Sequence, residues 1–193
     1  MNTNLRKAVI IVAVLNLAYF GIEFAVASAI GSVSLFADSI DFLEDTSLNF
    51  LIVIALGWSA TSRARLGMAL AGILLIPGFA TLWMAWEKVR SPLPPAPIAL
   101  SLTGLGALAI NLSCAFILAH FRTHSGSLTR AAFLSARNDA LANIAIIAAG
   151  FITAYTFSGW PDLIVGLGIA VMNAHAAREV WNVAHEENKA ANA

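Results

Sequence analysis

Six carboxylates lie within stretches of the sequence that are otherwise apolar. Out of eleven acids in the chain, these are Glu23, Asp38, Asp41, Glu44, Asp45 and Asp139. A carboxylate near the centre of a membrane-spanning helix costs about 2.5–3.5 kcal/mol on insertion scales. Among the basic residues only Arg137 lies deep within the same stretches, so internal ion pairs cannot neutralise the set. Either several of these acids are protonated or a cation is bound among them.

The spacing of the acids places several of them on shared helix faces. Asp38, Asp41 and Asp45 follow one another at intervals of three and four residues, so they share one face of a helix. Downstream, a second polar stripe recurs every four residues and consists of Ser135, Asp139 and Asn143. At 1.5 Å per residue, Asp45 lies about 18 Å from one membrane face and Asp139 about 16 Å from the other. Both are near the midplane of a core about 30 Å thick, so two antiparallel helices can bring Asp41, Asp45 and Asp139 to one point.

Carboxylate oxygens are ligands that suit a divalent cation. We therefore predict that Asp41, Asp45 and Asp139 bind a metal. The alternative is a polar patch that holds helices together through hydrogen bonds and shared protons. For Asp38 both interpretations stay open. In the first apolar stretch, residues on one face either pack against the second helix or line a cavity: Asn16, Tyr19 and Glu23.

Composition and hydropathy point to a membrane protein. The 193 residues are 59% apolar and only 11% charged, whereas soluble domains carry about 25% charged residues. A membrane-spanning helix needs roughly 20 mainly apolar residues. Six stretches qualify, at 8–30, 33–58, 66–86, 98–121, 128–152 and 161–183. We expect an all-α integral membrane protein that folds as a six-transmembrane-helix bundle.

The positive charges predict the orientation of this bundle. With the N-terminus inside, the cytoplasmic segments hold eight Lys and Arg residues and the opposite side holds only Lys88 and Arg90. Basic residues favour the cytoplasmic side, so both termini are predicted to be cytoplasmic. Residues 1–185 would then form the transmembrane transport domain, and residues 186–193 a short cytoplasmic tail.

Several other functions find no support in the sequence. The formal net charge is zero, which does not indicate a nucleic acid partner. The single cysteine, Cys114, cannot form an internal disulfide. There is no HExxH, CxxC pair, phosphate-binding glycine loop or nucleophile elbow. We therefore expect no enzymatic activity and no cofactor.

Two segments resemble the cation diffusion facilitator family. Residues 31–45, GSVSLFADSIDFLED, are similar to the second helix of that family, in which His or Asp is followed after three residues by Asp. Asp41 and Asp45 match those two ligands, and Asp38 matches an acid that precedes them. Residues 130–150, RAAFLSARNDALANIAIIAAG, resemble the fifth helix, where Asp139 matches the ligand. Asn16 and Glu23 fit a pattern of the family's first helix, and the resemblance spans nearly the whole chain.

Two departures from the family pattern affect the expected site and assembly. The family usually has His or Asp four residues before the fifth-helix ligand, where this chain has Ser135. Zinc sites favour a nitrogen or sulfur donor, so water, Ser135 or Asn138 would have to complete the ligand set. Most members also carry a cytoplasmic C-terminal domain, which we expect to be absent here. A homodimer would then form through the membrane helices.

The resemblance implies export of a divalent cation from the cytoplasm, by alternating access with metal/proton antiport. Three neighbouring carboxylates cannot all stay charged at low dielectric, which independently favours exchange with protons. Zinc is the first candidate and cadmium the second. Manganese, cobalt or iron are alternatives for an oxygen-rich site. We expect a bacterial inner membrane as the location. The rival functions are a non-transporting membrane scaffold and an exporter of small organic cations.

Overall fold

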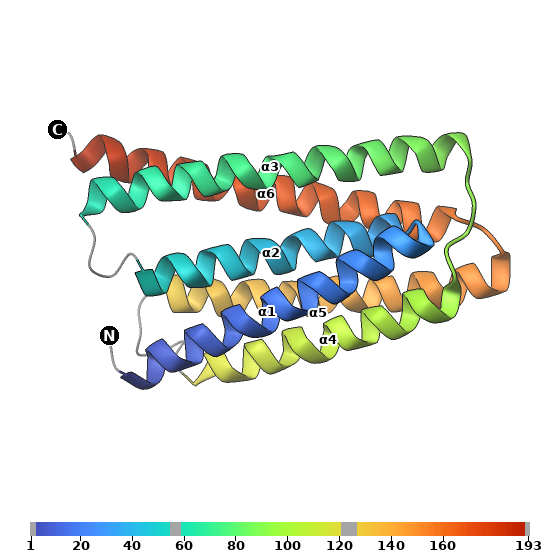
Figure 1. Cartoon of the computed structure of the whole chain (residues 1–193), viewed down its shortest axis with the longest axis horizontal. Coiled ribbons are helices and arrows are strands. Elements are labelled where there is room, and N and C mark those ends of the chain that lie inside the picture. The colour runs from blue at the N-terminus through green and yellow to red at the C-terminus, as the bar shows by residue number, and fades with distance from the viewer. Residues whose placement is uncertain (1–2, 55–58, 121–126, 192–193) are drawn as a thin grey trace.

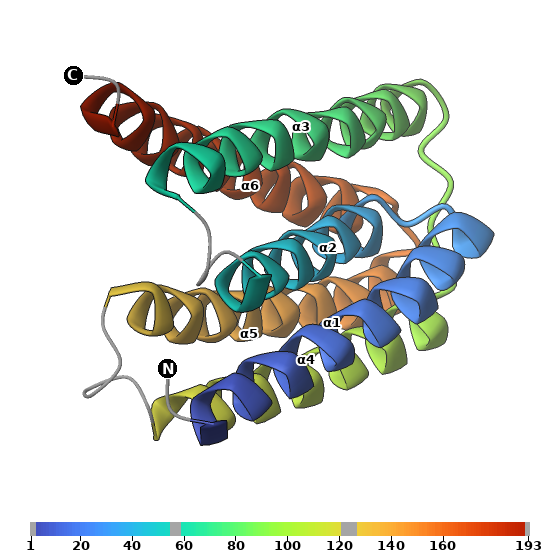
Figure 2. The same cartoon turned by 60° about the vertical axis from the view of Figure 1, so that its left-hand side comes forward.

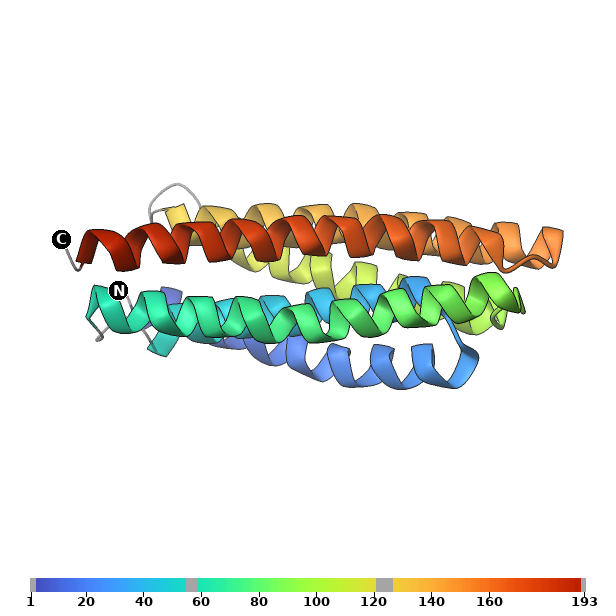
Figure 3. The same cartoon turned by 90° about the horizontal axis from the view of Figure 1, so that it is seen from above.

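The chain folds into six long helices that run along one common axis in the computed structural model (Figures 1 and 3). The structure describes residues 3–54, 59–120 and 127–191. The helices are α1 (Thr3–Ile30), α2 (Val33–Ile54), α3 (Ala60–Arg90), α4 (Pro97–Ala119), α5 (Ser127–Thr156) and α6 (Trp160–Ala191). The described part contains no strand. The prediction of an all-α six-helix bundle is therefore confirmed.

Each predicted span falls within one helix, apart from His120, which follows α4 in a turn, and residues 55–58 and 121, which lie outside the described ranges. Three helices have a stretch long and apolar enough to cross a membrane: Thr3–Ile30, Pro97–Ala119 and Ala136–Thr156. The acid-rich α2 does not meet this criterion, because four carboxylates lower its hydropathy. The predicted tail, residues 186–193, is helical as far as Ala191, so it forms the end of α6.

The helices form two groups, a pair and a set of four. α3 and α6 lie side by side along one edge of the molecule, while α1, α2, α4 and α5 form a four-helix group (Figures 1 and 2). Within that group α1 packs on α2, and α4 packs on α5. α2 contacts α3 and α6, and α5 also contacts α6, so α2 and α5 join the two groups. Both termini lie at the same end of the bundle (Figure 1).

Polar side chains lie inside the bundle, and large apolar side chains cover its outside. Asn16, Glu23, Asp38 and Asn143 are fully buried. By contrast, large apolar residues are exposed on several helices, for example Phe116 at 76%, Phe151 at 68% and Ile164 at 65%. This distribution would be unfavourable in water, but it fits a surface that faces lipid hydrocarbon. The burial pattern therefore agrees with a membrane protein.

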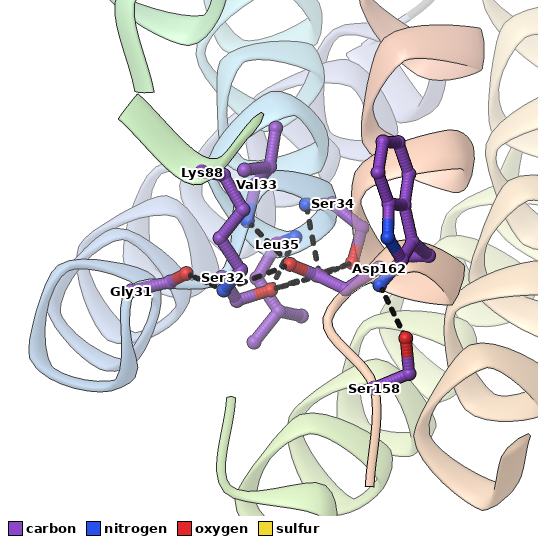
Figure 4. A network of polar contacts seen from close by, with 9 residues as sticks. Gly31, Ser32, Val33, Ser34, Leu35, Lys88, Ser158 and Asp162 are labelled. Atoms are coloured by element: carbon purple, nitrogen blue, oxygen red, sulfur yellow. Dashed lines mark hydrogen bonds and ion pairs between the residues drawn. The ribbon is translucent and has the colours of Figure 1, made fainter. Parts of the chain in front are cut away.

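At the end of the bundle opposite the termini, α6 holds the first turn of α2 (Figure 4). Gly31 turns the chain with a φ of +64°, a conformation that suits glycine. Asp162 of α6 is fully buried. It accepts hydrogen bonds from the hydroxyls of Ser32 and Ser34 at 2.6 Å, and from the Val33 amide at 2.9 Å. A carboxylate is favourable at a helix N-terminus, so Asp162 caps α2 from a distant part of the chain.

Lys88 at the end of α3 completes this junction. Its ammonium group lies 3.7 Å from Asp162 and donates a hydrogen bond of 2.6 Å to the Gly31 carbonyl. Gly166 lets α6 approach closely, because a Cβ there would lie 2.7 Å from backbone atoms of Val33 and Ser34. Three helices are thus tied together at the end of the molecule opposite the termini.

Candidate metal site

Three acids on one face of α2 point into the bundle. Asp38 is fully buried, Asp45 is 6% exposed, and Asp41 is half-buried. The three-and-four residue spacing that places them on one face is the periodicity of an α-helix, and α2 contacts all five other helices. The sequence-based expectation that these side chains avoid lipid is met by the structure.

Asp41 of α2 and Asp139 of α5 lie close enough for their charges to interact. Asp139 is 9% exposed and lies in the half of α5 nearer the termini. Among the charged neighbours of Asp41, Asp139 has the strongest electrostatic interaction, followed by Asp38. The weaker interactions are with Glu44 and Asp45 on the same helix. The structure thus brings together two predicted ligands that are distant in sequence.

The three predicted ligands do not form a closed site in this conformation. Among the residues that the structure describes, no three carboxylate, imidazole or thiol groups are arranged to hold one metal ion. Asp41 and Asp139 are close across two helices, and Asp45 follows one turn further along α2.

The Asp45 carboxylate has a partner on α1. The Asn16 side-chain nitrogen donates a hydrogen bond to Asp45 Oδ2 at 3.4 Å. The thiol of Cys114 on α4 donates to the Asn16 side-chain oxygen at 3.5 Å. The Asn49 amide donates to the Asp45 backbone carbonyl at 2.7 Å. The sequence left open whether Asn16 packs against α2 or lines a cavity. The structure shows that Asn16 packs against α2, where its side chain contacts the candidate ligand Asp45.

A chain of buried amides leads to Asp38. The Asn111 amide donates to the Asn143 side-chain oxygen at 3.0 Å, and the Asn143 amide donates to Asp38 Oδ2 at 2.5 Å. All three residues are buried, and they belong to α4, α5 and α2. The other oxygen of Asp38 has no hydrogen-bond partner. Asn143 therefore fixes the Asp38 carboxylate and leaves one of its oxygens available.

Glu23 of α1 lies against Asp38. It interacts electrostatically with Asp38 and Asp41, and it is fully buried. No amide, hydroxyl or basic group of the described residues donates to its carboxylate oxygens, and its side chain is within hydrogen-bonding range of Asp38. The four acids Glu23, Asp38, Asp41 and Asp139 therefore form a connected series across α1, α2 and α5.

Besides Asp45, two of the predicted ligands are not placed in this series. Asn138 is exposed and accepts a hydrogen bond from Arg137 at 3.3 Å. It precedes Asp139 by one residue, which is about 100° around a helix, so it points away when Asp139 points inward. The structure does not bring Asn138 to the carboxylates. Ser135 lies on α5, but its side chain falls outside the described residues.

The junction around Asp162 was missed by the sequence analysis. A Pro-Asp pair in the first turn of α6 suggests a helix start, and Ser32 and Ser34 suggest a helix cap. Neither signal indicates that the aspartate caps a different helix. That contact depends on how α6 packs on α2.

The sequence comparisons agree with the arrangement of the helices and acids. Residues 9–182 match the family model described as the cation efflux transmembrane domain. This match covers all six helices in whole or in part and includes every predicted ligand. No curated protein has a significantly similar sequence.

Proposed function

Since this chain belongs to the cation efflux family, a family of divalent cation transporters, we propose that it exports a divalent metal cation in exchange for protons. The observation that carries the proposal is the approach of Asp41 on α2 to Asp139 on α5. Two carboxylates repel each other at low dielectric, and a bound cation removes that repulsion.

The proposed site contains Asp41, Asp45 and Asp139, with the cation as substrate. In one conformation the three carboxylates take up the cation and release protons, because a metal binds the ionised forms. In the other conformation they separate, and protons replace the cation. The described geometry, with Asp41 and Asp139 adjacent and Asp45 one turn away, corresponds to a site that is not closed around an ion.

The donor set bears on the choice of metal. Carboxylates supply only oxygen, which all the candidate metals accept. We propose zinc as the transported ion, with cadmium as a second substrate. Manganese, cobalt and iron are the alternatives, because a nitrogen donor is missing from the proposed ligands. We further propose that both termini face the cytoplasm of a bacterial inner membrane and that the protein is a homodimer through its membrane helices.

Proton flux in liposomes tests the site. Purified protein is reconstituted with a pH-sensitive dye inside, and zinc is added outside. Asp45→Ala and Asp139→Ala are each expected to abolish zinc-dependent proton flux, because each removes a ligand. Glu186→Ala, which changes an exposed acid at the end of α6, is the control and is expected to retain full flux. Full flux in both site variants would remove the assignment of the site.

Metal binding by the wild-type protein and its variants distinguishes a transporter from a scaffold. A scaffold whose acids only hold helices together predicts no metal binding and tolerance of Asp→Asn changes at the three positions. Calorimetric titration with zinc, cadmium, manganese, cobalt and iron then ranks the metals. A protein that binds none of them would favour the scaffold.

A further inference from the structure

A buried hydrogen-bond chain leads from α4 through α5 to an acid of α2. The side-chain nitrogen of Asn111 donates to Asn143 Oδ1 at 3.0 Å, and the side-chain nitrogen of Asn143 donates to Asp38 Oδ2 at 2.5 Å. We name this chain the Asp38 relay. Both asparagines and the aspartate are buried, so water does not compete for these hydrogen bonds.

A second buried chain leads from α4 through α1 to the proposed ligand Asp45. The Cys114 thiol donates to Asn16 Oδ1 at 3.5 Å, and the Asn16 side-chain nitrogen donates to Asp45 Oδ2 at 3.4 Å. We name this chain the Asp45 relay, and its three side chains are also buried. Its hydrogen bonds are longer and therefore weaker than those of the Asp38 relay, so the Asp45 carboxylate is oriented but can still turn toward an ion.

Both relays have the same donor-to-acceptor direction. An ionised carboxylate only accepts hydrogen bonds, whereas an asparagine side chain both donates and accepts. In each relay the donor on α4, Asn111 or Cys114, binds the asparagine oxygen and leaves the asparagine NH2 group for the carboxylate. The reversed amide would place its oxygen against the carboxylate, so that two acceptors would face each other. The donors on α4 thus fix the amide orientation that both acids require.

The two relays begin on one face of α4 and end on one face of α2. Asn111 and Cys114 are three residues apart on α4. Asp38 and Asp45 are seven residues apart on α2, and both spacings keep side chains on a single helix face. α4 itself contains no acid, and it packs mainly on α5 and α1. It therefore acts on the acid-bearing face of α2 through one asparagine of α5 and one of α1.

We propose that Asn16 is a positioning residue of the transport site, which orients the Asp45 carboxylate for the divalent cation, and that Cys114 holds Asn16 in the required orientation. The inference rests on the proposed transport function and deepens it, because it assigns part of the metal affinity to α1 and α4, which contribute no proposed ligand. A hydrogen bond to a ligating carboxylate orients it before the ion arrives, and removal of such a bond typically costs about 10–100-fold in metal affinity.

Zinc-dependent proton flux in liposomes, measured over a range of zinc concentrations, tests the role of Asn16. Asn16→Leu has a side chain of similar size that cannot donate. It is expected to raise the zinc concentration at half-maximal flux by about 10-fold or more, with little change in the maximal rate.

Asn173→Leu is the matched control. The Asn173 side chain of α6 donates to the backbone carbonyl of Ala37 on α2 at 3.1 Å, so the same substitution removes a hydrogen bond to the backbone of α2 rather than to a carboxylate. It is expected to lower stability and to leave the half-maximal zinc concentration unchanged. An equal increase in Asn173→Leu and Asn16→Leu would show a general effect of helix packing and would reject the positioning role.

A double-mutant cycle tests whether Cys114 acts through Asn16. Cys114→Ala alone is expected to raise the half-maximal zinc concentration by a smaller factor than Asn16→Leu. In the Asn16→Leu background the same change is expected to have no further effect, because the thiol then has no amide to orient. Independent effects of the two changes would mean that Cys114 contributes separately, and would reject the relay through Asn16.

The outcomes separate this proposal from the transport site. If Asn16→Leu and Cys114→Ala both keep the wild-type half-maximal concentration while Asp45→Ala abolishes flux, the positioning role is rejected and the transport site stands. If Asp45→Ala and Asp139→Ala keep full flux, the transport site is rejected and the positioning role with it. Gel filtration and thermal unfolding verify that each variant is folded. Cys114→Ala removes only one weak donor, so its half-maximal concentration decides the question even if Asn16→Leu does not fold.

Discussion

Asn143 lies between two buried partners, donating to Asp38 and accepting from Asn111. Thr153, further along the same helix, is equally buried, but its hydroxyl has no hydrogen-bond partner. Both are buried polar residues in an apolar helix, but only Asn143 makes side-chain hydrogen bonds. Comparing substitutions at the two positions therefore shows how much a buried polar group contributes to stability when it is hydrogen-bonded and when it is not.

We expect Asn143→Leu to destabilise the bundle by about 1–3 kcal/mol, because it leaves Asp38 and Asn111 without a partner. Thr153→Val removes a hydroxyl that makes no hydrogen bond, so it is expected to be neutral or slightly stabilising. Thermal unfolding can be followed by reaction of Cys114, the single cysteine, with a thiol-reactive dye. Equal melting temperatures for the two variants would contradict the hydrogen-bond chain.

Among the elements, α6 and α2 meet most closely at the end opposite the termini. Asp162 caps α2, and Gly166, one turn further along α6, lies against the Val33–Ser34 backbone. Two turns of α6 thus hold the first turn of α2. This contact fixes the N-terminal end of the helix that carries Asp38, Asp41 and Asp45.

Gly166→Ala tests this contact. A Cβ at Gly166 would lie 2.7 Å from backbone atoms, which cannot move as a flexible side chain does. We expect a loss of about 1–3 kcal/mol in stability, as for other overpacked sites. Gly168→Ala is the matched control on the same helix, because nothing lies within 4 Å of its added Cβ. Alanine also favours helices over glycine, so the control is expected to melt at the same or a higher temperature.

For the whole molecule, the arrangement in the membrane decides the direction of transport. Both termini lie at one end of the bundle, and the 91–96 connection between α3 and α4 lies at the other (Figure 1). The excess of positive charge at the terminal end predicts that this end faces the cytoplasm. In the proposed export, the cation would then move from the end with the termini to the end with Asp162.

Cysteine labelling in intact cells tests this orientation. Ser91→Cys and Glu186→Cys place single exposed thiols at opposite ends of the bundle, and native Cys114 is buried and gives little background. A membrane-impermeant maleimide is expected to label Ser91→Cys and to leave Glu186→Cys unlabelled until the membrane is permeabilised. The reverse pattern would overturn the orientation and the export direction.

Hydropathy and spacing in the sequence were sufficient to predict the six helices and the face that carries Asp38, Asp41 and Asp45. These are local properties, because helix periodicity and the cost of exposing polar groups to lipid act within one segment. They were also enough to single out Asp139, since an acid in an apolar stretch needs a protein interior or a water-filled cavity.

Contacts between helices were decided only by the tertiary structure. It paired Asp41 with Asp139, brought Glu23 against Asp38, directed Asn138 outward, and used Asp162 of α6 to cap α2. Each outcome depends on the rotation and axial position of one helix against another. Those are set by close packing of many side chains at once, which the periodicity of a single segment does not specify.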